Sequence, residues 1–264
     1  MNILKISYIY RLANKLVTGN LKQKIFFMHV PKCGGTSISR AIRSSYGFGK
    51  TQGSNFFFQL DASASLRAAK ILGYKELEFF ENLLIYNMSI SSRKYIDGHF
   101  VYSEKAFKEF GDEWKFVTLL RHPVSKWFSK YFFNRYKKGS HYKLDCDFET
   151  YIESKTGIAE GSDYVRCLTG SNLLHDSNLE RAVEQAIRNL NNFTVIGVLE
   201  KINLFVRDFE RQFGTKLFIE HLRSNPLPKI KQEEQITNRI KQRVEEICQP
   251  DIEVYKAVLE RIKI

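Results

Sequence analysis

Short apolar runs rich in aromatic and β-branched residues recur along the chain, and each is bounded by polar or turn-forming positions. They are KIFFMHV (24–30), KYIDGHF (94–100), KFVTLL (115–120), FTVIGVL (193–199) and KLFIEHL (216–222). Runs of this length and composition are typical of buried strands. The pattern therefore predicts five strands.

Segments with apolar residues at helical spacing lie between or after these runs. The predicted helices cover about 36–45, 62–84, 103–110, 123–137, 179–191, 203–213, 231–247 and 251–262. Strands that alternate with helices indicate an α/β fold with a mostly parallel sheet flanked by helices. No stretch has the composition of an interdomain linker, so we expect a single domain.

Two segments depart from this alternation. Residues 1–22 mix lysine and arginine with apolar residues, and we expect them to form an N-terminal helical extension before a domain that spans 23–264. Residues 138–178 are polar with weak periodicity. They predict a substrate-side insertion within that domain, because long polar loops in compact domains are commonly functional.

The charge of the chain indicates an anionic partner. Lysine and arginine outnumber aspartate and glutamate by 41 to 29, which gives a formal net charge of +12 and a pI near 9.4. Nucleic acid, a membrane, a nucleotide and an acidic glycan all satisfy this charge.

Cysteine usage and the first residues bear on cellular location. Cys33, Cys146, Cys167 and Cys248 are far apart and form no C-x-x-C pair, which favours a reducing compartment. The start of the chain has no uninterrupted apolar run of roughly 18 residues and no signal-peptide core. We therefore expect a cytoplasmic protein, with residues 1–20 either packed on the domain or resting on the inner face of a membrane.

The stretch MHVPKCGGTSIS (28–39) has the composition of a phosphate-binding turn after a strand. Gly34 and Gly35 let the backbone approach a ligand, and the two residues after them lie where a helix would begin. Unpaired amides at a helix start favour phosphate or sulfate, and Lys32 adds a positive charge. Because the lysine precedes the glycines, the segment is not G-x-x-x-x-G-K-[ST], which disfavours a Walker-type ATPase. A tight structural turn is the alternative.

A second strand-to-helix junction has complementary chemistry. In LLRHPVSKWFSKYF (119–132), Pro123 suits the first helical position, so that Arg121 lies at the mouth of the strand. Ser125 and Ser129 are four residues apart and share one helical face. An arginine fork and a serine hydroxyl together suit a second phosphate.

The two segments in this order, about 90 residues apart, resemble the paired cofactor signatures of sulfotransferases that use 3′-phosphoadenosine-5′-phosphosulfate (PAPS). The segments resemble in particular the carbohydrate type related to heparan 2-O-sulfotransferases (sulfotransferase family 2), and the detailed resemblance covers residues 24–135. In that family the first loop holds the 5′-phosphosulfate and the second element holds the 3′-phosphate. By position, the resemblance assigns Lys32, Cys33, Gly34, Gly35, Thr36 and Ser37 to the first site, and Arg121 and Ser129 to the second. It implies a P-loop-like fold, with 23–264 as the sulfotransferase domain.

Sulfuryl transfer to a hydroxyl requires a base that is active near neutral pH, and histidine is the usual choice. We expect His99 in YIDGHFVY to be that base, because it follows a strand and should face the same sheet edge as the two loops. GH after a strand also resembles the position of the catalytic histidine in the 2-O-sulfotransferase-like branch. A hydrogen-bonded histidine at a strand end is the alternative.

Lys32 is expected to neutralise charge at the bridging oxygen of the donor, whereas His29 is expected to lie beside the core. Asp97 and Glu200 are candidate helpers of the base or structural carboxylates.

The sequence thus predicts an O-sulfotransferase that moves a sulfuryl group from PAPS to a hydroxyl of a carbohydrate or glycan acceptor, including acidic or lipid-linked glycans, without a metal. One alternative is a P-loop-like nucleotide kinase or hydrolase, for which no carboxylate after an apolar strand stands out as a magnesium ligand. The other is a basic nucleic-acid-binding protein, for which the sequence has no reader motif. We therefore expect no nucleic-acid partner.

Overall fold

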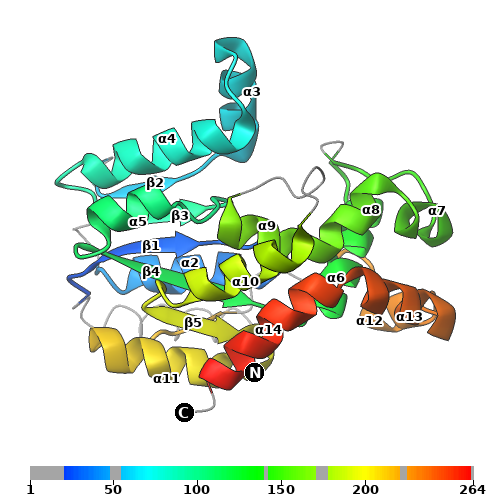
Figure 1. Cartoon of the computed structure of the whole chain (residues 1–264). Coiled ribbons are helices and arrows are strands. Elements are labelled where there is room, and N and C mark those ends of the chain that lie inside the picture. Colours follow the sequence, from blue (N-terminus) through cyan, green and yellow to red (C-terminus); the bar gives the residue numbers. More distant parts are fainter. Residues whose placement is uncertain (1–20, 48–54, 140–141, 171–177, 221–224, 263–264) are drawn as a thin grey trace.

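A five-stranded, all-parallel sheet forms the centre of the molecule (Figure 1). The computed structural model describes residues 21–47, 55–139, 142–170, 178–220 and 225–262. The strand order is β2-β3-β1-β4-β5. The strands are β1 (Lys24–Met28), β2 (Phe57–Gln59), β3 (Tyr95–Gly98), β4 (Trp114–Leu120) and β5 (Val195–Val198). The predicted α/β fold with a parallel sheet is confirmed.

The register aligns the carboxyl ends of the three inner strands. At the end of β1, Met28 lies beside Gly98 of β3 and beside Thr118 of β4. The loops that leave these strands therefore open at one edge of the sheet, where parallel sheets bind their ligands.

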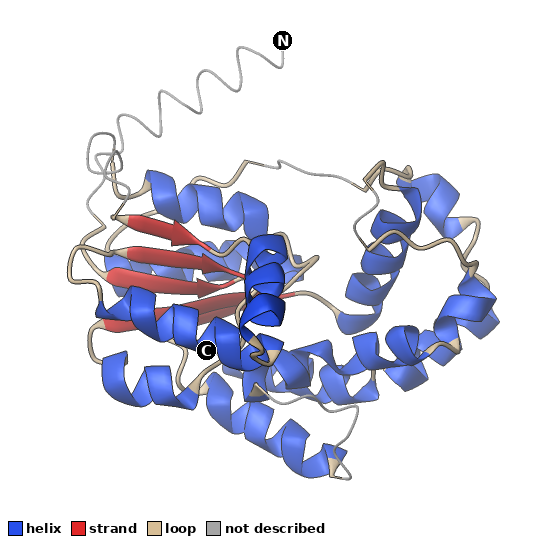
Figure 2. Cartoon of the chain, turned by 90° about the horizontal axis from the view of Figure 1, so that it is seen from above, coloured by secondary structure: helices blue, strands red, loops and turns tan. Residues whose placement is uncertain are grey.

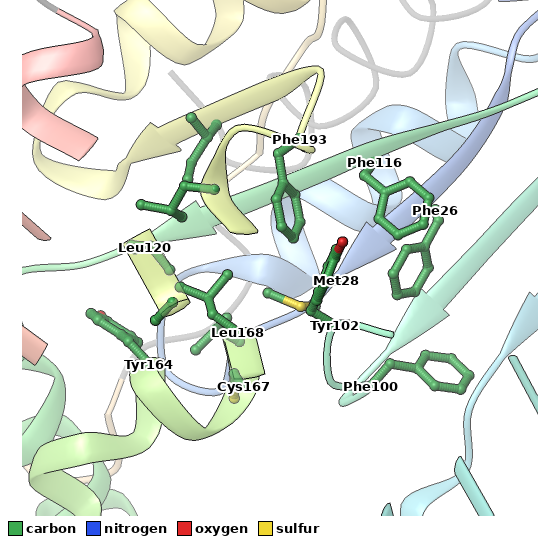
Figure 3. Packing of buried hydrophobic residues seen from close by; sticks show 14 of the residues in the cluster. Phe26, Met28, Phe100, Tyr102, Phe116, Leu120, Tyr164, Cys167, Leu168 and Phe193 are labelled. Atoms are coloured by element: carbon green, nitrogen blue, oxygen red, sulfur yellow. The ribbon is translucent and has the colours of Figure 1, made fainter. Parts of the chain in front are cut away.

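Helices cover both faces of the sheet because side chains alternate along each strand. One face, with Ile25 and Phe27, packs against α2 (Gly35–Ser44) and α11 (Ile202–Phe213). The other face, with Phe26 and Met28, packs against the remaining covering helices. These are α4 (Glu76–Ser89), α5 (Glu104–Phe110), α9 (Asp163–Thr169), α10 (Leu179–Leu190) and α14 (Gln249–Arg261). Figure 3 shows this second core, in which Cys167 and Leu168 of α9 approach Met28.

A separate group of helices lies beyond the carboxyl ends of the strands (Figures 1 and 2). It comprises α6 (Pro123–Tyr136), α7 (Phe148–Ile152), α8 (Lys155–Ala159), α12 (Lys229–Glu233) and α13 (Asn238–Ile247). Its core is aromatic, and the ring centroids of Tyr131 and Phe148 are 3.9 Å apart. This group supplies a wall opposite the strand ends.

The predicted insertion 138–178 is more ordered than its weak periodicity suggested. It contains α7 and α8, a 3-10 turn (Glu160–Ser162) and α9, and α9 belongs to the core that covers the sheet. Side-chain caps start its first two helices, from Asp147 and Ser154. Residues 140–141 and 171–177 of this segment lie outside the described residues.

Three predicted elements differ from the structure. The strand predicted at 216–222 is absent from its described part, residues 216–220, where Leu217 is buried without strand pairing. The predicted helix 62–84 is two helices, α3 (Ala62–Leu72) and α4, because Gly73 takes a left-handed conformation and ends α3. The predicted helix 231–247 is likewise divided, since Thr237 caps the start of α13. The short strand β2 was not predicted.

The helical extension predicted for residues 1–22 lies almost entirely outside the described residues, which begin at Leu21. Leu21 is buried and donates its amide to the Ser45 carbonyl, 3.2 Å away. Across the described ranges, we find no helix that combines the length and apolar character needed to cross a membrane.

Candidate active site

A large cleft lies between the carboxyl ends of the inner strands and the helical group. Its volume is about 1590 Å³, which exceeds the roughly 300–1,000 Å³ of most small-molecule sites. Of the predicted site residues, the cleft is lined by Lys32, Gly34, Gly35, Thr36, Ser37, His99, Arg121 and Ser129. The structure therefore brings together residues from three different strand ends.

The loop after β1 has the geometry of a turn that presents its backbone. Lys32 and Gly34 both have positive φ, 64° and 79°, and Gly34 is the residue before α2. A Cβ on Gly35 would lie 2.0 Å from Cδ2 of His29, so glycine is required there for packing. Gly35 and Thr36 line the cleft at the start of α2, where backbone amides have no helical acceptor, whereas the Ser37 amide already donates to the Gly34 carbonyl at 3.2 Å.

Lys32 holds its charge inside the cleft. Its Nζ lies 3.7 Å from the ring centroid of Phe133, on α6 in the opposite wall. A cation over an aromatic face is stabilised without losing its charge. The ammonium group of Lys32 is thus held in the cleft, across from the loop after β1.

Arg121 lies beside the same loop, and the buried Tyr164 holds its backbone through hydrogen bonds. Its Nη1 donates to the Lys32 carbonyl at 3.4 Å. Tyr164 Oη accepts from the Arg121 amide at 3.0 Å and donates to the Arg121 carbonyl at 2.5 Å. Ser129, two turns into α6, lines the cleft from the opposite wall, one turn before Phe133. The two predicted anion sites are therefore adjacent.

Cys33 is the predicted site residue that does not line the cleft. Its side chain is fully buried, with Sγ 3.5 Å from Tyr164 Oη. Burial raises the pKa of this thiol to about 12, so the thiol stays protonated. Only the backbone of Cys33 can belong to an anion site.

The contacts of His99 determine which ring nitrogen is available. Nδ1 lies 3.0 Å from the His29 carbonyl oxygen, and a carbonyl only accepts, so Nδ1 carries the hydrogen and Nε2 has the free lone pair. The two imidazole centroids are 4.7 Å apart. Desolvation by the surrounding protein lowers the pKa of His99 below 6.5, against an opposing effect of the hydrogen bond to His29. The ring is therefore neutral at neutral pH.

Asp97 and Glu200 both have structural partners. Asp97 is fully buried and accepts a hydrogen bond from Ser39 of α2, and burial raises the pKa of its carboxyl to about 6. Glu200 accepts from the His122 amide at 2.9 Å and from Tyr255 Oη at 3.1 Å. Of the two predicted roles, the structural one is observed.

An ionic network that the sequence did not reveal forms one side of the cleft. Asp163 pairs with Lys126 at 2.8 Å and with Arg166 at 2.5 Å, and Lys130 pairs with Glu160. Burial by itself would raise the pKa of Asp163, but Lys126, Lys130 and Arg166 hold it well below its usual range. Its members come from α6 and from the distant start of α9, so no local motif marks them.

Comparison with known proteins gives no match, either with a family model or with a curated protein. Within the described ranges, no group of three or more histidine, cysteine, aspartate or glutamate side chains gathers as metal ligands.

Proposed function

We propose that this chain is a PAPS-dependent O-sulfotransferase that transfers a sulfuryl group to a hydroxyl of a carbohydrate or glycan. One observation carries the proposal: the two loops that resemble anion sites and a histidine with a free Nε2 lone pair meet in one cleft, from the ends of β1, β4 and β3. The resemblance of the two loops to PAPS signatures identifies the anions they would bind.

The residues present suit such a donor. Left-handed Gly34 and the start of α2 offer backbone amides to the 5′-phosphosulfate, and Lys32 adds a cation. Arg121 and Ser129 suit the 3′-phosphate, because a guanidinium binds phosphate oxygens in pairs. When bound, PAPS supplies an activated sulfuryl group.

The remaining chemistry belongs to this chain's own groups. His99 Nε2 accepts the proton of the acceptor hydroxyl, while its Nδ1–H stays on the His29 carbonyl. A base positioned in this way typically contributes ~10²–10⁴ in rate. Lys32 and the amides of the loop oppose the negative charge that develops on the leaving phosphate.

The two carboxylates expected near the loops, Asp97 and Glu200, give no support to magnesium-dependent phosphoryl transfer. The carboxylate nearest the end of β3, Asp97, is 0% exposed and bonded to Ser39. Glu200, after β5, caps the His122 amide. Neither carboxylate is directed to a metal beside the loop, as a nucleotide kinase or hydrolase would need. A nucleic-acid-binding role has only the net charge in its favour.

We further place the protein in the cytoplasm, at the inner face of a membrane when its acceptor is lipid-linked. The described cysteines, including the buried Cys167 and Cys248, are free thiols, which suits a reducing compartment. The volume of the cleft leaves space for a glycan beside the donor.

Thermal unfolding with 3′-phosphoadenosine-5′-phosphate (PAP), with ADP, and with ATP plus magnesium tests the donor site. A ligand at about 100 times its dissociation constant stabilises the fold by roughly 2.7 kcal/mol, so we expect a clear shift with PAP alone. Arg121→Gln should abolish the shift, whereas Arg181→Gln on the exposed face of α10 should keep it. A shift only with ATP and magnesium would support the kinase alternative, and no shift with any nucleotide would contradict the proposal.

A further inference from the structure

The turn that joins α3 to α4 holds large apolar side chains in solvent. Nine large hydrophobic side chains are exposed among the described residues, and three of them fall within 71–74: Ile71 is 73% exposed, Leu72 60% and Tyr74 45%. Figure 1 shows α3 rising from the end of α4, away from the sheet. Scattered apolar residues are ordinary on a surface, but a cluster on a projecting element indicates a contact.

The backbone of this turn is ordered by its own hydrogen bonds. Gly73 has a left-handed conformation, its amide donates to the Lys70 carbonyl, and the Tyr74 amide donates to the Ala69 carbonyl. This is the Schellman arrangement that ends a helix. Tyr74 also packs on Phe79, with ring centroids 6.0 Å apart. Ile71 and Leu72 are therefore held outward by a preformed turn.

Exposed lysines flank the apolar side chains. Lys70 precedes Ile71, Lys75 follows Tyr74, and Arg67 lies one turn earlier on α3. Glu76 and Glu78 follow within the first turn of α4, where negative charge is favourable to the helix itself. The net charge of +12 for the whole chain acts in the same direction as the lysines.

We propose that the turn of residues 70–75 docks the protein on membranes with anionic headgroups, with Ile71, Leu72 and Tyr74 inserted at headgroup level. Apolar side chains on a narrow turn, a tyrosine and flanking lysines suit this interface, where lysine stems lie along acyl chains while their ammonium groups reach lipid phosphates. A second copy of the chain suits it less. Stable protein interfaces bury about 800 Å² per partner and exclude lysine from their centres, and one turn offers neither.

Docking would also orient the cleft. Leu66 of α3 and Leu77 of α4 line the cleft, so the helices that carry the turn form one of its walls. A docked turn therefore brings that wall to the lipid surface. If the proposed sulfotransferase function holds, an acceptor attached to a lipid could enter directly. The docking itself does not depend on that function.

Flotation of the full chain with vesicles is the test, using phosphatidylcholine mixed with phosphatidylglycerol and phosphatidylcholine alone. We expect flotation with the anionic vesicles, reduced about tenfold or more by Ile71→Glu combined with Leu72→Glu. Ile230→Glu is the matched control, because Ile230 is 71% exposed and also lies between two lysines, on α12. Equal flotation of the double variant and the wild type would overturn the proposal, as would an equal loss with Ile230→Glu.

A reporter at the turn separates this site from any contact made elsewhere in the chain. Trp114 and Trp127 are 0% and 1% exposed, so Leu72→Trp adds the environment-sensitive signal. We expect its emission to shift to shorter wavelength with anionic vesicles only. Flotation without that shift would mean that another part of the chain docks. Light scattering that shows a dimer, dissociated by the double variant, would assign the turn to a second copy instead.

Discussion

His29 links the two halves of the candidate active site. Its carbonyl accepts from His99 Nδ1, and its ring lies between the His99 imidazole and the backbone of Gly35. A side chain added at Gly35 would therefore press on the His29 ring, which in turn contacts the His99 imidazole. The sequence indicated only that His29 lies beside the core, because nothing local relates it to a histidine 70 positions away.

Gly35→Ala tests this packing. The added Cβ would meet the His29 ring at 2.0 Å, and overpacking of this kind typically costs about 1–3 kcal/mol. We expect lower stability in urea unfolding and a smaller stabilisation by PAP. Combining it with His29→Ala should restore much of the stability.

Gly139→Ala is the matched control for that cycle, because a Cβ there meets nothing within 4 Å. It should leave stability within about 0.5 kcal/mol of the wild type. A double variant no more stable than Gly35→Ala would show that the strain has another source.

His99→Ala tests the base. With the free Nε2 removed, we expect turnover to fall by ~10²–10⁴, while the thermal shift with PAP stays unchanged. Full turnover with an intact PAP site would assign the proton transfer to another group.

The pH profile provides an independent check on His99. The neutral ring is the active form, and desolvation by the surrounding protein lowers its pKa below 6.5, although the side chain is exposed in the cleft. Activity should therefore persist as the pH falls through 6.5 and decline only below it. An acid limb centred above 6.5 would contradict this environment.

Helix α6 lines the cleft with one face and packs into the core with another. Pro123 begins it, as predicted, and Ser129 and Phe133 line the cleft. Lys126, on the buried side, is 1% exposed and pairs with Asp163 at the start of α9. Periodicity predicts the helix. It does not predict the partner of the buried Lys126, because Asp163 lies 37 positions further along the chain.

Asp163→Asn should be strongly destabilising. It leaves Lys126 buried without its charge partner, and breaking a buried pair in this way costs about 3–5 kcal/mol. Urea unfolding measures the difference. Glu184→Gln, which breaks an exposed pair with Arg188 on α10, is the control and should cost less than about 1 kcal/mol.

The pH dependence of that stability has a definite sign. The folded pKa of Asp163 lies well below its ordinary value of 3.8. The contribution of its carboxylate to stability is therefore complete above that value and is lost as the pH falls through the folded pKa. The Asp163→Asn variant should lack this loss. An identical acid dependence in both proteins would contradict the assignment.

The cleft lies between two parts of the molecule. The loops of the sheet form one side, and the helices that pack around Trp127 and Tyr131 form the other (Figure 2). A ligand that spans the cleft therefore contacts elements with separate hydrophobic cores.

Hydrogen exchange tests whether PAP joins these parts. We expect slower exchange at 31–37 and in α6 when PAP is bound, because both contribute to the two predicted anion sites. We expect little change in α11, which packs on a face of the sheet. Protection confined to α11 or to α13 would place the nucleotide elsewhere.

Local patterns were sufficient to predict the strands β1, β3, β4 and β5, the parallel sheet and the two loops that line the cleft. These follow from local features: apolar runs of strand length, glycines at a turn and a proline at a helix start. Most predicted boundaries lie within one or two residues of those observed. The division of 62–84 at Gly73 and the unpaired segment around Leu217 were missed, because tertiary neighbours decide whether a helix continues or a strand pairs.

Which side chains meet depends on how the layers pack. Parallel register brought His99 and Lys32 to one edge, placed Cys33 in the core instead of the cleft, and paired Lys126 with Asp163. In the folded chain, Asp97 accepts a hydrogen bond from Ser39 and does not pair with His99. Such contacts join residues tens of positions apart, and their free energy depends on burial and distance, which a chain acquires only when its layers pack.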